Sequence, residues 1–190
     1  MMTARTRAAA RFAAAALLIG SLMLAGCSQS PRGGADALPS QTPSADRFVA
    51  AADAVPAPKA TGELVDGTEV DLASLWTARP LVLQFTSTWC TQCTDLESDL
   101  SALSGELGDD VLVVHIALDE PSDTIQTYLK DNDVTGPVLV DRTGAIWRDY
   151  AVKEPPMTAL VDTSGGIVRM WPGGASGDQL REALATITAG

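Results

Sequence analysis

Apolar residues follow two different spacings along the C-terminal two thirds of this chain. Short runs rich in valine, isoleucine and aromatic residues predict strands, whereas leucine or isoleucine recurring every three or four residues predicts helices. The predicted strands are 81–85, 111–118, 137–140, 157–161 and 167–171. The predicted helices are one carrying Leu96, Leu100, Leu103 and Leu107, one over 122–131, a short turn over 145–150, and a last one capped by Ser176 or Asp178. These elements predict one folded domain over residues 60–190.

A tight turn is predicted at the start of that domain. Asp66-Gly67 separates the strand-like segments 63–65 and 68–72. This dipeptide suits the positive φ angles of a two-residue hairpin turn. We therefore expect an N-terminal β-hairpin.

The N-terminus has the layout of an export signal. Three arginines lie within the first eleven residues, and residues 12–23 are apolar apart from one glycine and one serine. This run is shorter than the ~20 residues that a membrane-spanning helix needs. It ends in Leu24-Ala25-Gly26-Cys27, which resembles the lipobox of bacterial lipoproteins. The sequence predicts a signal peptide over 1–26 and lipidation of Cys27, the alternative being an ordinary secreted protein cleaved nearby.

The segment 27–59 resembles a linker. It is rich in proline, serine and alanine, and we expect a disordered tether that holds the domain away from the membrane. Its one apolar patch, Phe48-Val49-Ala50, is interpreted as solvated, the alternative being that it docks on the domain. The inferred location is extracytoplasmic, with the protein anchored by its lipid to the outer face of the cytoplasmic membrane.

Charge and cysteine content narrow the classes of function. The chain of 190 residues carries a net charge of −11, which becomes −14 once residues 1–26, with three arginines and no acidic residue, are removed. Such an acidic protein is a poor partner for nucleic acid or for anionic lipid surfaces. Three cysteines are present, and neither a second cysteine pair nor a histidine cluster completes a four-ligand zinc site. We expect no metal, no cofactor, no nucleic acid, and a monomer.

The remaining two cysteines form a Cys-x-x-Cys pair where a strand passes into a helix. Cys90 follows the predicted strand 81–85 and begins the helix, and Cys93 lies one turn further on. Free backbone N–H groups and the positive end of the helix dipole favour a thiolate at Cys90. A pair in this setting indicates redox chemistry, and an inert structural disulfide is the alternative.

Several motifs occur along the chain in a characteristic order and spacing. They are Asp66-Gly67, Phe85, Trp89-Cys90-Thr91-Gln92-Cys93, Pro137 to Asp141, Gly144, Tyr150 to Val152, and Pro156 to Asp162 with Gly166 to Val168. Together they resemble the thioredoxin-like TlpA/ResA type of thiol-disulfide oxidoreductase. The resemblance implies an α/β thioredoxin-like fold with a mixed central sheet flanked by helices. It implies that Cys90 is the nucleophile, that Cys93 resolves the mixed disulfide, and that Pro156 follows a cis bond from Pro155. Trp89, Pro155 and Pro156 are then expected to contact the substrate.

The chain departs from this family pattern at four positions. Gln84 stands where thioredoxins have a buried acid, and Leu96 where the TlpA/ResA type often has a glutamate. Ser98 replaces a helix-kinking proline, and Pro155 has no N–H to offer a substrate strand. Asp95 and Glu97 flank the apolar helix face and are expected to point away from it. Water is therefore the expected proton acceptor for Cys93.

Two classes of function follow. The leading hypothesis is a lipid-anchored reductant that receives electrons from a membrane thiol donor and acts on cysteines of extracytoplasmic proteins. Family analogy suggests cytochrome c biogenesis or copper-site assembly as uses. The alternative is a copper(I) chaperone that uses the cysteine pair with Met157. A peroxiredoxin is disfavoured because Leu83 and Ser87 replace the proline and threonine of that family, and the single His115 is interpreted as structural.

Overall fold

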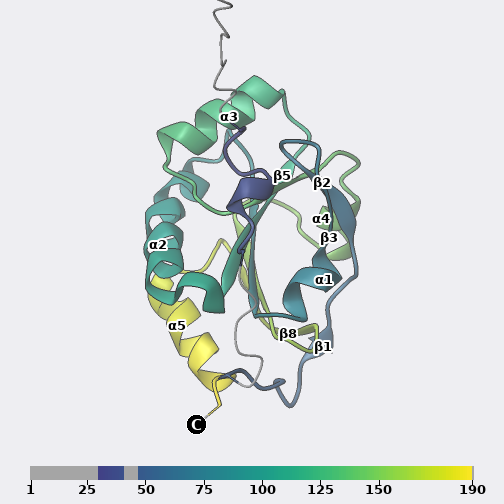
Figure 1. The fold of residues 1–190 in the computed structure, drawn as a ribbon, viewed down its shortest axis with the longest axis vertical. Coiled ribbons are helices and arrows are strands. Elements are labelled where there is room, and N and C mark those ends of the chain that lie inside the picture. The colour runs from purple at the N-terminus through teal and green to yellow at the C-terminus, as the bar shows by residue number, and fades with distance from the viewer. Residues whose placement is uncertain (1–29, 41–46, 190) are drawn as a thin grey trace, which may run out of the picture.

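The computed structural model describes residues 30–40 and 47–189, which form a mixed β-sheet with helices on both faces (Figure 1). Within these residues, eight strands lie in the order β1-β8-β7-β4-β5-β6-β2-β3. The strands are β1 (Val55–Pro56), β2 (Thr61–Leu64), β3 (Glu69–Asp71), β4 (Leu81–Thr86), β5 (Leu112–Leu118), β6 (Val138–Asp141), β7 (Met157–Val161) and β8 (Gly166–Pro172). The predicted α/β fold with a mixed central sheet is confirmed.

Strand β4 runs through the middle of the sheet. It pairs in parallel with β5 and antiparallel with β7, and β5 pairs in parallel with β6. All six residues of β4 are buried. The carboxyl ends of β4, β5 and β6 therefore meet at one edge of the sheet. The Cys90–Cys93 pair follows the end of β4 at this edge.

The helices form a layer on each face of this sheet. Helices α2 (Thr91–Leu107) and α5 (Gly177–Thr186) lie together on one face, and the short α1 (Leu72–Trp76) and α4 (Ala145–Asp149) lie on the other (Figure 1). Helix α3 (Ser122–Asp131) packs at one end of the molecule, where its Ile125 and Leu129 contact a cluster that includes Val138 of β6. Two short 3₁₀ turns, η1 (Ala35–Ala37) and η3 (Gly108–Asp110), complete the described elements.

Alternate residues of β4 serve opposite faces of the sheet, as the two-residue strand period requires. Leu83 and Phe85 belong to the hydrophobic cluster that includes residues of α1 and α4. Val82 belongs to the cluster that includes residues of α2 and α5. By the same alternation Gln84 lies on the α2 face, where it is fully buried.

The N-terminal hairpin and the remaining predicted elements are confirmed. Strands β2 and β3 pair antiparallel, and Gly67 at their turn has a φ of 86°. Ser176 caps α5 in a reciprocal capping box with Gln179, as the serine at that position predicted. Helix α1 was not predicted; Asp71 caps it by accepting a hydrogen bond of 2.9 Å from the backbone N–H of Ala73.

The described part of the expected tether packs on the domain instead of remaining solvated. Phe48 is only 9% exposed and forms a β-bridge with Thr188 near the end of the chain. The backbone N–H of Ala51 donates a 2.8 Å hydrogen bond to the buried Asp162. The interpretation of Phe48-Val49-Ala50 as a solvated patch is therefore wrong for Phe48, whose burial outweighs the linker-like composition, whereas Val49 and Ala50 are exposed.

A second tether segment contacts the opposite end of the molecule. The carbonyl of Gly33 accepts a 2.7 Å hydrogen bond from the backbone N–H of Val138, and Gly33 has a φ of 82°. A Cβ atom at Gly33 would lie 2.6 Å from Val138 Cγ2, so this close approach requires glycine. Arg32 and Gln126 exchange two hydrogen bonds, of 2.9 and 3.0 Å. Residues 30–38 thus pack on β6 and α3, although their composition predicted disorder.

The predicted signal peptide and Cys27 lie outside the described residues. Among residues 30–40 and 47–189, the structure contains no helix with the length and apolar character needed to cross a membrane.

Candidate active site

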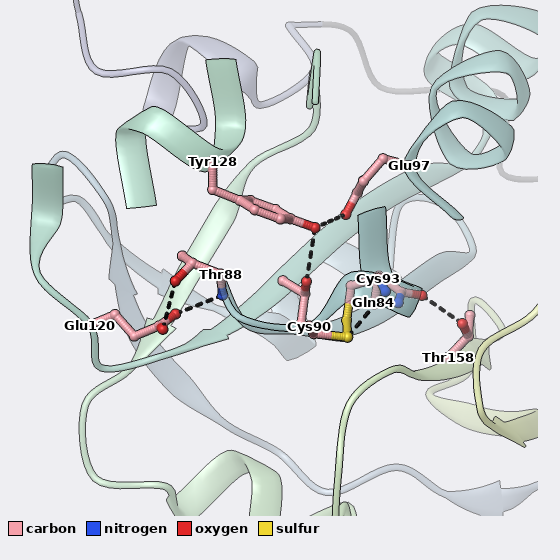
Figure 2. Close-up of a disulfide and its surroundings, with 9 residues drawn as sticks. Gln84, Thr88, Cys90, Cys93, Glu97, Glu120, Tyr128 and Thr158 are labelled. Carbon is pink, nitrogen blue, oxygen red and sulfur yellow. Dashed lines mark hydrogen bonds between the residues drawn. A yellow bond between two sulfur atoms is a disulfide. The ribbon is translucent and has the colours of Figure 1, made fainter. Parts of the chain in front are cut away.

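The cysteine pair lies where the buried strand β4 passes into α2. Cys90 is the N-cap of α2, and its Sγ accepts a 3.1 Å hydrogen bond from the backbone N–H of Cys93. The two residues form a disulfide (Figure 2). Cys90 is 6% exposed and Cys93 is fully buried. An incoming thiol or disulfide therefore reaches Cys90 first.

Trp89, which precedes Cys90, is 65% exposed. A large apolar side chain this exposed beside a reactive sulfur provides contact area for a partner. The other three tryptophans, at positions 76, 147 and 171, are 6% exposed or less and pack in the core. The predicted contact of Trp89 with substrate stays a prediction.

The proline loop lies beside the second turn of α2. The bond between Pro155 and Pro156 is cis, as predicted. The carbonyl of Pro156 accepts a 2.9 Å hydrogen bond from the backbone N–H of Gly173. A Cβ atom at the neighbouring Gly174 would lie 2.1 Å from Leu96 Cδ1 and 3.4 Å from Pro156 Cγ. Leu96 therefore packs against the loop at Gly174, near the cis-proline, and supplies no polar group to the cysteines.

Gln84, at the position of the usual buried acid, is held by a neighbouring strand. Its Oε1 accepts a 2.6 Å hydrogen bond from Thr158 Oγ1, and Thr158 Oγ1 in turn accepts one of 3.0 Å from the backbone N–H of Ala175. Gln84 Nε2 is buried without a hydrogen-bond partner. Gln84 thus ties β4 to β7, and its amide cannot act as a base.

Glu97 corrects the expectation that the acids near Leu96 point into solvent. Its side chain is 1% exposed, and its carboxylate lies 2.9 Å from His115 Nε2 and accepts a 3.1 Å hydrogen bond from Tyr128 Oη (Figure 2 shows the Tyr128 contact). Residues four apart on a helix share a face, and Glu97 is four residues after the buried Cys93. Asp95 is exposed, as expected. The site therefore contains a buried carboxylate after all.

His115 and Tyr128 complete this buried polar cluster. His115 is 2% exposed and lies beside Gln84 in the register of β4 and β5. Tyr128, from α3, is 8% exposed, and its hydroxyl also lies 3.4 Å from Thr86 Oγ1. Burial, followed by the negative charge of Glu97, raises the pKa of Tyr128 to about 12. Tyr128 therefore remains a neutral hydrogen-bond donor over the physiological range.

Glu120 holds the loop that leads to Cys90, and the sequence did not predict this role. Its two carboxylate oxygens accept hydrogen bonds of 3.0 and 2.8 Å from the backbone N–H and the hydroxyl of Thr88 (Figure 2). Glu120 follows the end of β5, and the parallel strand β4 ends at the same edge of the sheet. That shared edge is the signal from which the contact could have been expected.

Met157 is the third ligand of the copper(I) alternative. Met157 is 5% exposed and packs in the cluster that contains Phe85 and Trp147. Among the described residues, no group of three or more histidine, cysteine or acidic side chains has the geometry to hold a metal ion.

The sheet order, the cysteine pair at the start of α2 and the cis-proline beside it define a thioredoxin-like oxidoreductase of the thiol-disulfide class. Comparison with known proteins agrees with this class. The chain belongs to the AhpC/TSA family, which matches residues 54–170.

Relatives and solved structures are similar over the same region. Thiol-disulfide oxidoreductase ResA of Bacillus thuringiensis subsp. konkukian is 26% identical over 125 residues, which cover 65% of this chain and 72% of that protein. A secreted disulfide oxidoreductase of Mycobacterium tuberculosis, described as homologous to E. coli DsbE, is 27% identical with a TM-score of 0.60, over 67% of this chain and 96% of that one. The exposed lipoprotein thioredoxin Etrx1 of Streptococcus pneumoniae is 26% identical with a TM-score of 0.60, over 68% and 100% of the two chains. The resemblance inferred from the motifs is confirmed.

Proposed function

We propose that this protein is an extracytoplasmic, lipid-anchored reductant of disulfides in other proteins. The observation that carries the proposal is the asymmetry of the cysteine pair, in which Cys90 caps the helix and keeps 6% of its surface exposed while Cys93 is fully buried. Only one sulfur of the pair is placed for an encounter with a large partner. This asymmetry supports Cys90 as the nucleophile and Cys93 as the resolving cysteine.

The reaction follows from these roles. The Cys90 thiolate attacks a substrate disulfide and forms a mixed disulfide, releasing one substrate thiolate, which takes a proton from solvent. Cys93 then loses its proton and attacks Cys90 Sγ, so the Cys90–Cys93 disulfide forms and the second substrate thiol leaves. Two electrons pass from the cysteine pair to the substrate. A membrane thiol donor would return two electrons and restore the dithiol.

Glu120 supports the reducing direction. Strong oxidants of this class are oxidising because their reduced, thiolate form is stabilised. Here a carboxylate is hydrogen-bonded to Thr88, two residues before Cys90, where its negative charge opposes the favourable effect of the helix start on a thiolate. A destabilised thiolate makes the dithiol a better electron donor.

Two features support the location. The arginines and apolar run before Cys27 have the order of a lipoprotein signal, and the printed descriptions of two structural relatives are a secreted protein and an exposed lipoprotein. Intact mass and detergent partitioning of the membrane fraction test the anchor, with Cys27→Ser as the control. An aqueous native protein whose first residue is not Cys27 would refute lipidation.

Trapping tests the roles of the cysteines. Cys93→Ser should accumulate mixed disulfides with extracytoplasmic proteins, seen as dithiothreitol-sensitive bands that carry the protein. Cys90→Ser should accumulate none, although it is equally folded. Equal trapping by the two variants would overturn the assignment.

A further inference from the structure

A buried polar cluster of Glu97, His115 and Tyr128 includes a residue on the same buried face of α2 as the resolving cysteine, because Glu97 follows Cys93 by four residues. The side chains of Glu97 and His115 are 1% and 3% exposed, and Glu97 Oε2 lies 2.9 Å from His115 Nε2. Burying such groups costs free energy unless each is paired, and a pair of this kind is weak evidence for stability by itself. Because Glu97 and Cys93 lie on the same face of α2, the cluster is placed to take part in the chemistry of Cys93.

The hydrogen-bond pattern indicates which atom can take a proton. An ionised carboxylate only accepts hydrogen bonds, so Glu97 requires His115 Nε2 and Tyr128 Oη to be donors. Each carboxylate oxygen then keeps lone-pair capacity for one more proton. His115 Nδ1 is buried without a hydrogen-bond partner among the described residues, so the imidazole is fixed through Nε2 alone.

The cluster also has an outlet to solvent. Tyr128 lines a surface pocket between α2 and α3, together with Thr88, Thr94 and Asn132. A proton on Glu97 is therefore one hydrogen bond from a side chain that borders water. Cys93, by contrast, is fully buried.

We infer that Glu97, held by His115 and Tyr128, accepts the proton that Cys93 must lose before it attacks the mixed disulfide. The inference rests on the proposed role of Cys93 as the resolving cysteine. The Cys93 thiol gives its proton to the Glu97 carboxylate, the thiolate attacks Cys90 Sγ, and the bond between Cys90 and the substrate sulfur breaks. The proton on Glu97 later passes to solvent at the Tyr128 pocket. His115 and Tyr128 are positioning residues in this step.

The surroundings of the cluster are consistent with that role. The titratable groups that face it are Cys93 and Glu97 from α2, His115 from β5 and Tyr128 from α3. The neighbouring strands β4 and β7 contribute the neutral side chains Gln84, Thr86 and Thr158. Among the described residues, Glu97 is thus the carboxyl group of this cluster, and it lies on the same buried face of α2 as Cys93.

Reaction with 5,5′-dithiobis(2-nitrobenzoate) isolates the step. Attack by Cys90 on the reagent releases one nitrothiobenzoate, and attack by Cys93 on the resulting mixed disulfide releases a second one. This leaving group needs no proton, so the second phase in stopped flow reports deprotonation and attack by Cys93. The first phase, together with trapping by Cys93→Ser, tests the proposed function separately.

We expect the native second phase to be independent of pH around neutrality. Glu97→Gln should slow it by about 10²-fold at pH 7, as for loss of a general base, and make it rise about tenfold per pH unit. Asp95→Asn, an exposed acid on the same helix, is the matched control and should match the native protein. Unchanged kinetics in a folded Glu97→Gln variant, or a native rate that rises steadily with pH, would overturn the inference and restore water as the acceptor.

A second measurement decides the question if Glu97→Gln does not fold. His115 is the only histidine in the chain, so its ring signals in a ¹H–¹⁵N spectrum are unambiguous. They should differ between the disulfide and dithiol forms of the native protein, and Tyr128→Phe should slow the second phase while leaving the first unchanged. Identical ring signals in both forms, with no effect of Tyr128→Phe, would show that the cluster is only structural.

Discussion

The two faces of the central sheet differ most at the edge where the disulfide lies. On the face covered by α1 and α4, β4 presents Leu81, Leu83 and Phe85, which pack among aromatic residues. On the α2 face the same strand changes from Val82 to Gln84, and the neighbouring β5 changes from Val113 to His115. Apolar packing thus continues to the edge on one face, while the other becomes a buried polar cluster under Cys93. The first face stabilises the fold, and the second holds groups that can exchange protons.

Truncating the apolar face tests this division with the largest expected effect. Leu83 is fully buried, so Leu83→Ala should lower the free energy of unfolding by about 2–5 kcal/mol through lost burial and a cavity. Urea denaturation measures the change, with Val55→Ala, at a residue 65% exposed, as the control. The rate constants of the folded variant with a small disulfide should stay close to native. A large loss of rate in the folded protein would mean that the two faces are not separate in function.

Asp162 tests a polar group that serves stability alone. Burial by itself would raise the pKa of this carboxyl, but hydrogen bonds from Ser164, Ala51 and Gly166 outweigh burial and lower it. A pKa lowered by folding contributes stability that is present above the ordinary value and lost as the pH falls through the folded value.

Asp162→Asn should therefore cost about 1–3 kcal/mol at pH 7, because a charged acceptor of several hydrogen bonds is lost. The difference from native should narrow as the pH falls below the ordinary carboxyl pKa of about 4, where the unfolded chain takes up a proton, and should vanish as the pH falls through the lowered pKa of the folded carboxyl. Thermal unfolding at several pH values provides the test, with the exposed Asp53→Asn as control. A difference that stays constant down to pH ~2 would contradict the carboxylate account.

Glu120→Gln should change the free energy of unfolding least of these variants, but it should change the reduction potential of the cysteine pair measurably. The amide can keep one hydrogen bond from the Thr88 backbone and reverse the one with its hydroxyl, so mainly the charge is lost. We expect the reduction potential to rise by about 15–30 mV, a threefold to tenfold change in the equilibrium with glutathione. Asp123→Asn, an exposed acid in the first turn of α3, should leave the potential unchanged. A lower potential in Glu120→Gln would reverse the proposed effect of its charge.

The sequence predicted the regular elements well because their apolar spacing is imposed by burial. The boundaries of α2, β7 and α5 follow directly from leucine spacing, from the proline loop and from a serine cap. Glu97 was wrongly predicted to point away from the buried face of α2, because that face was drawn from Leu96 through the later leucines. The buried face instead runs from Cys93 through Glu97 to Leu100.

The packing of the tether and the hydrogen bonds from Thr88 to Glu120 could not be predicted in the same way. Gly33 and Phe48 lie in segments whose composition is that of a linker, and their burial depends on surfaces formed by Val138 and Thr188, far along the chain. Glu120 acts across two loops. Such contacts depend on the assembled sheet, which no local pattern in the sequence encodes.

The reduction potential of the Cys90–Cys93 pair tests the central claim most directly. The native protein is equilibrated with glutathione and with dithiothreitol buffers, and the dithiol fraction is measured by mass after thiol alkylation. If the negative charge of Glu120 destabilises the Cys90 thiolate and makes the protein a reductant, its reduction potential should be about −270 mV, as in thioredoxin. A reduction potential of about −120 mV, as in a strong oxidant, would contradict the proposal that the protein is a reductant.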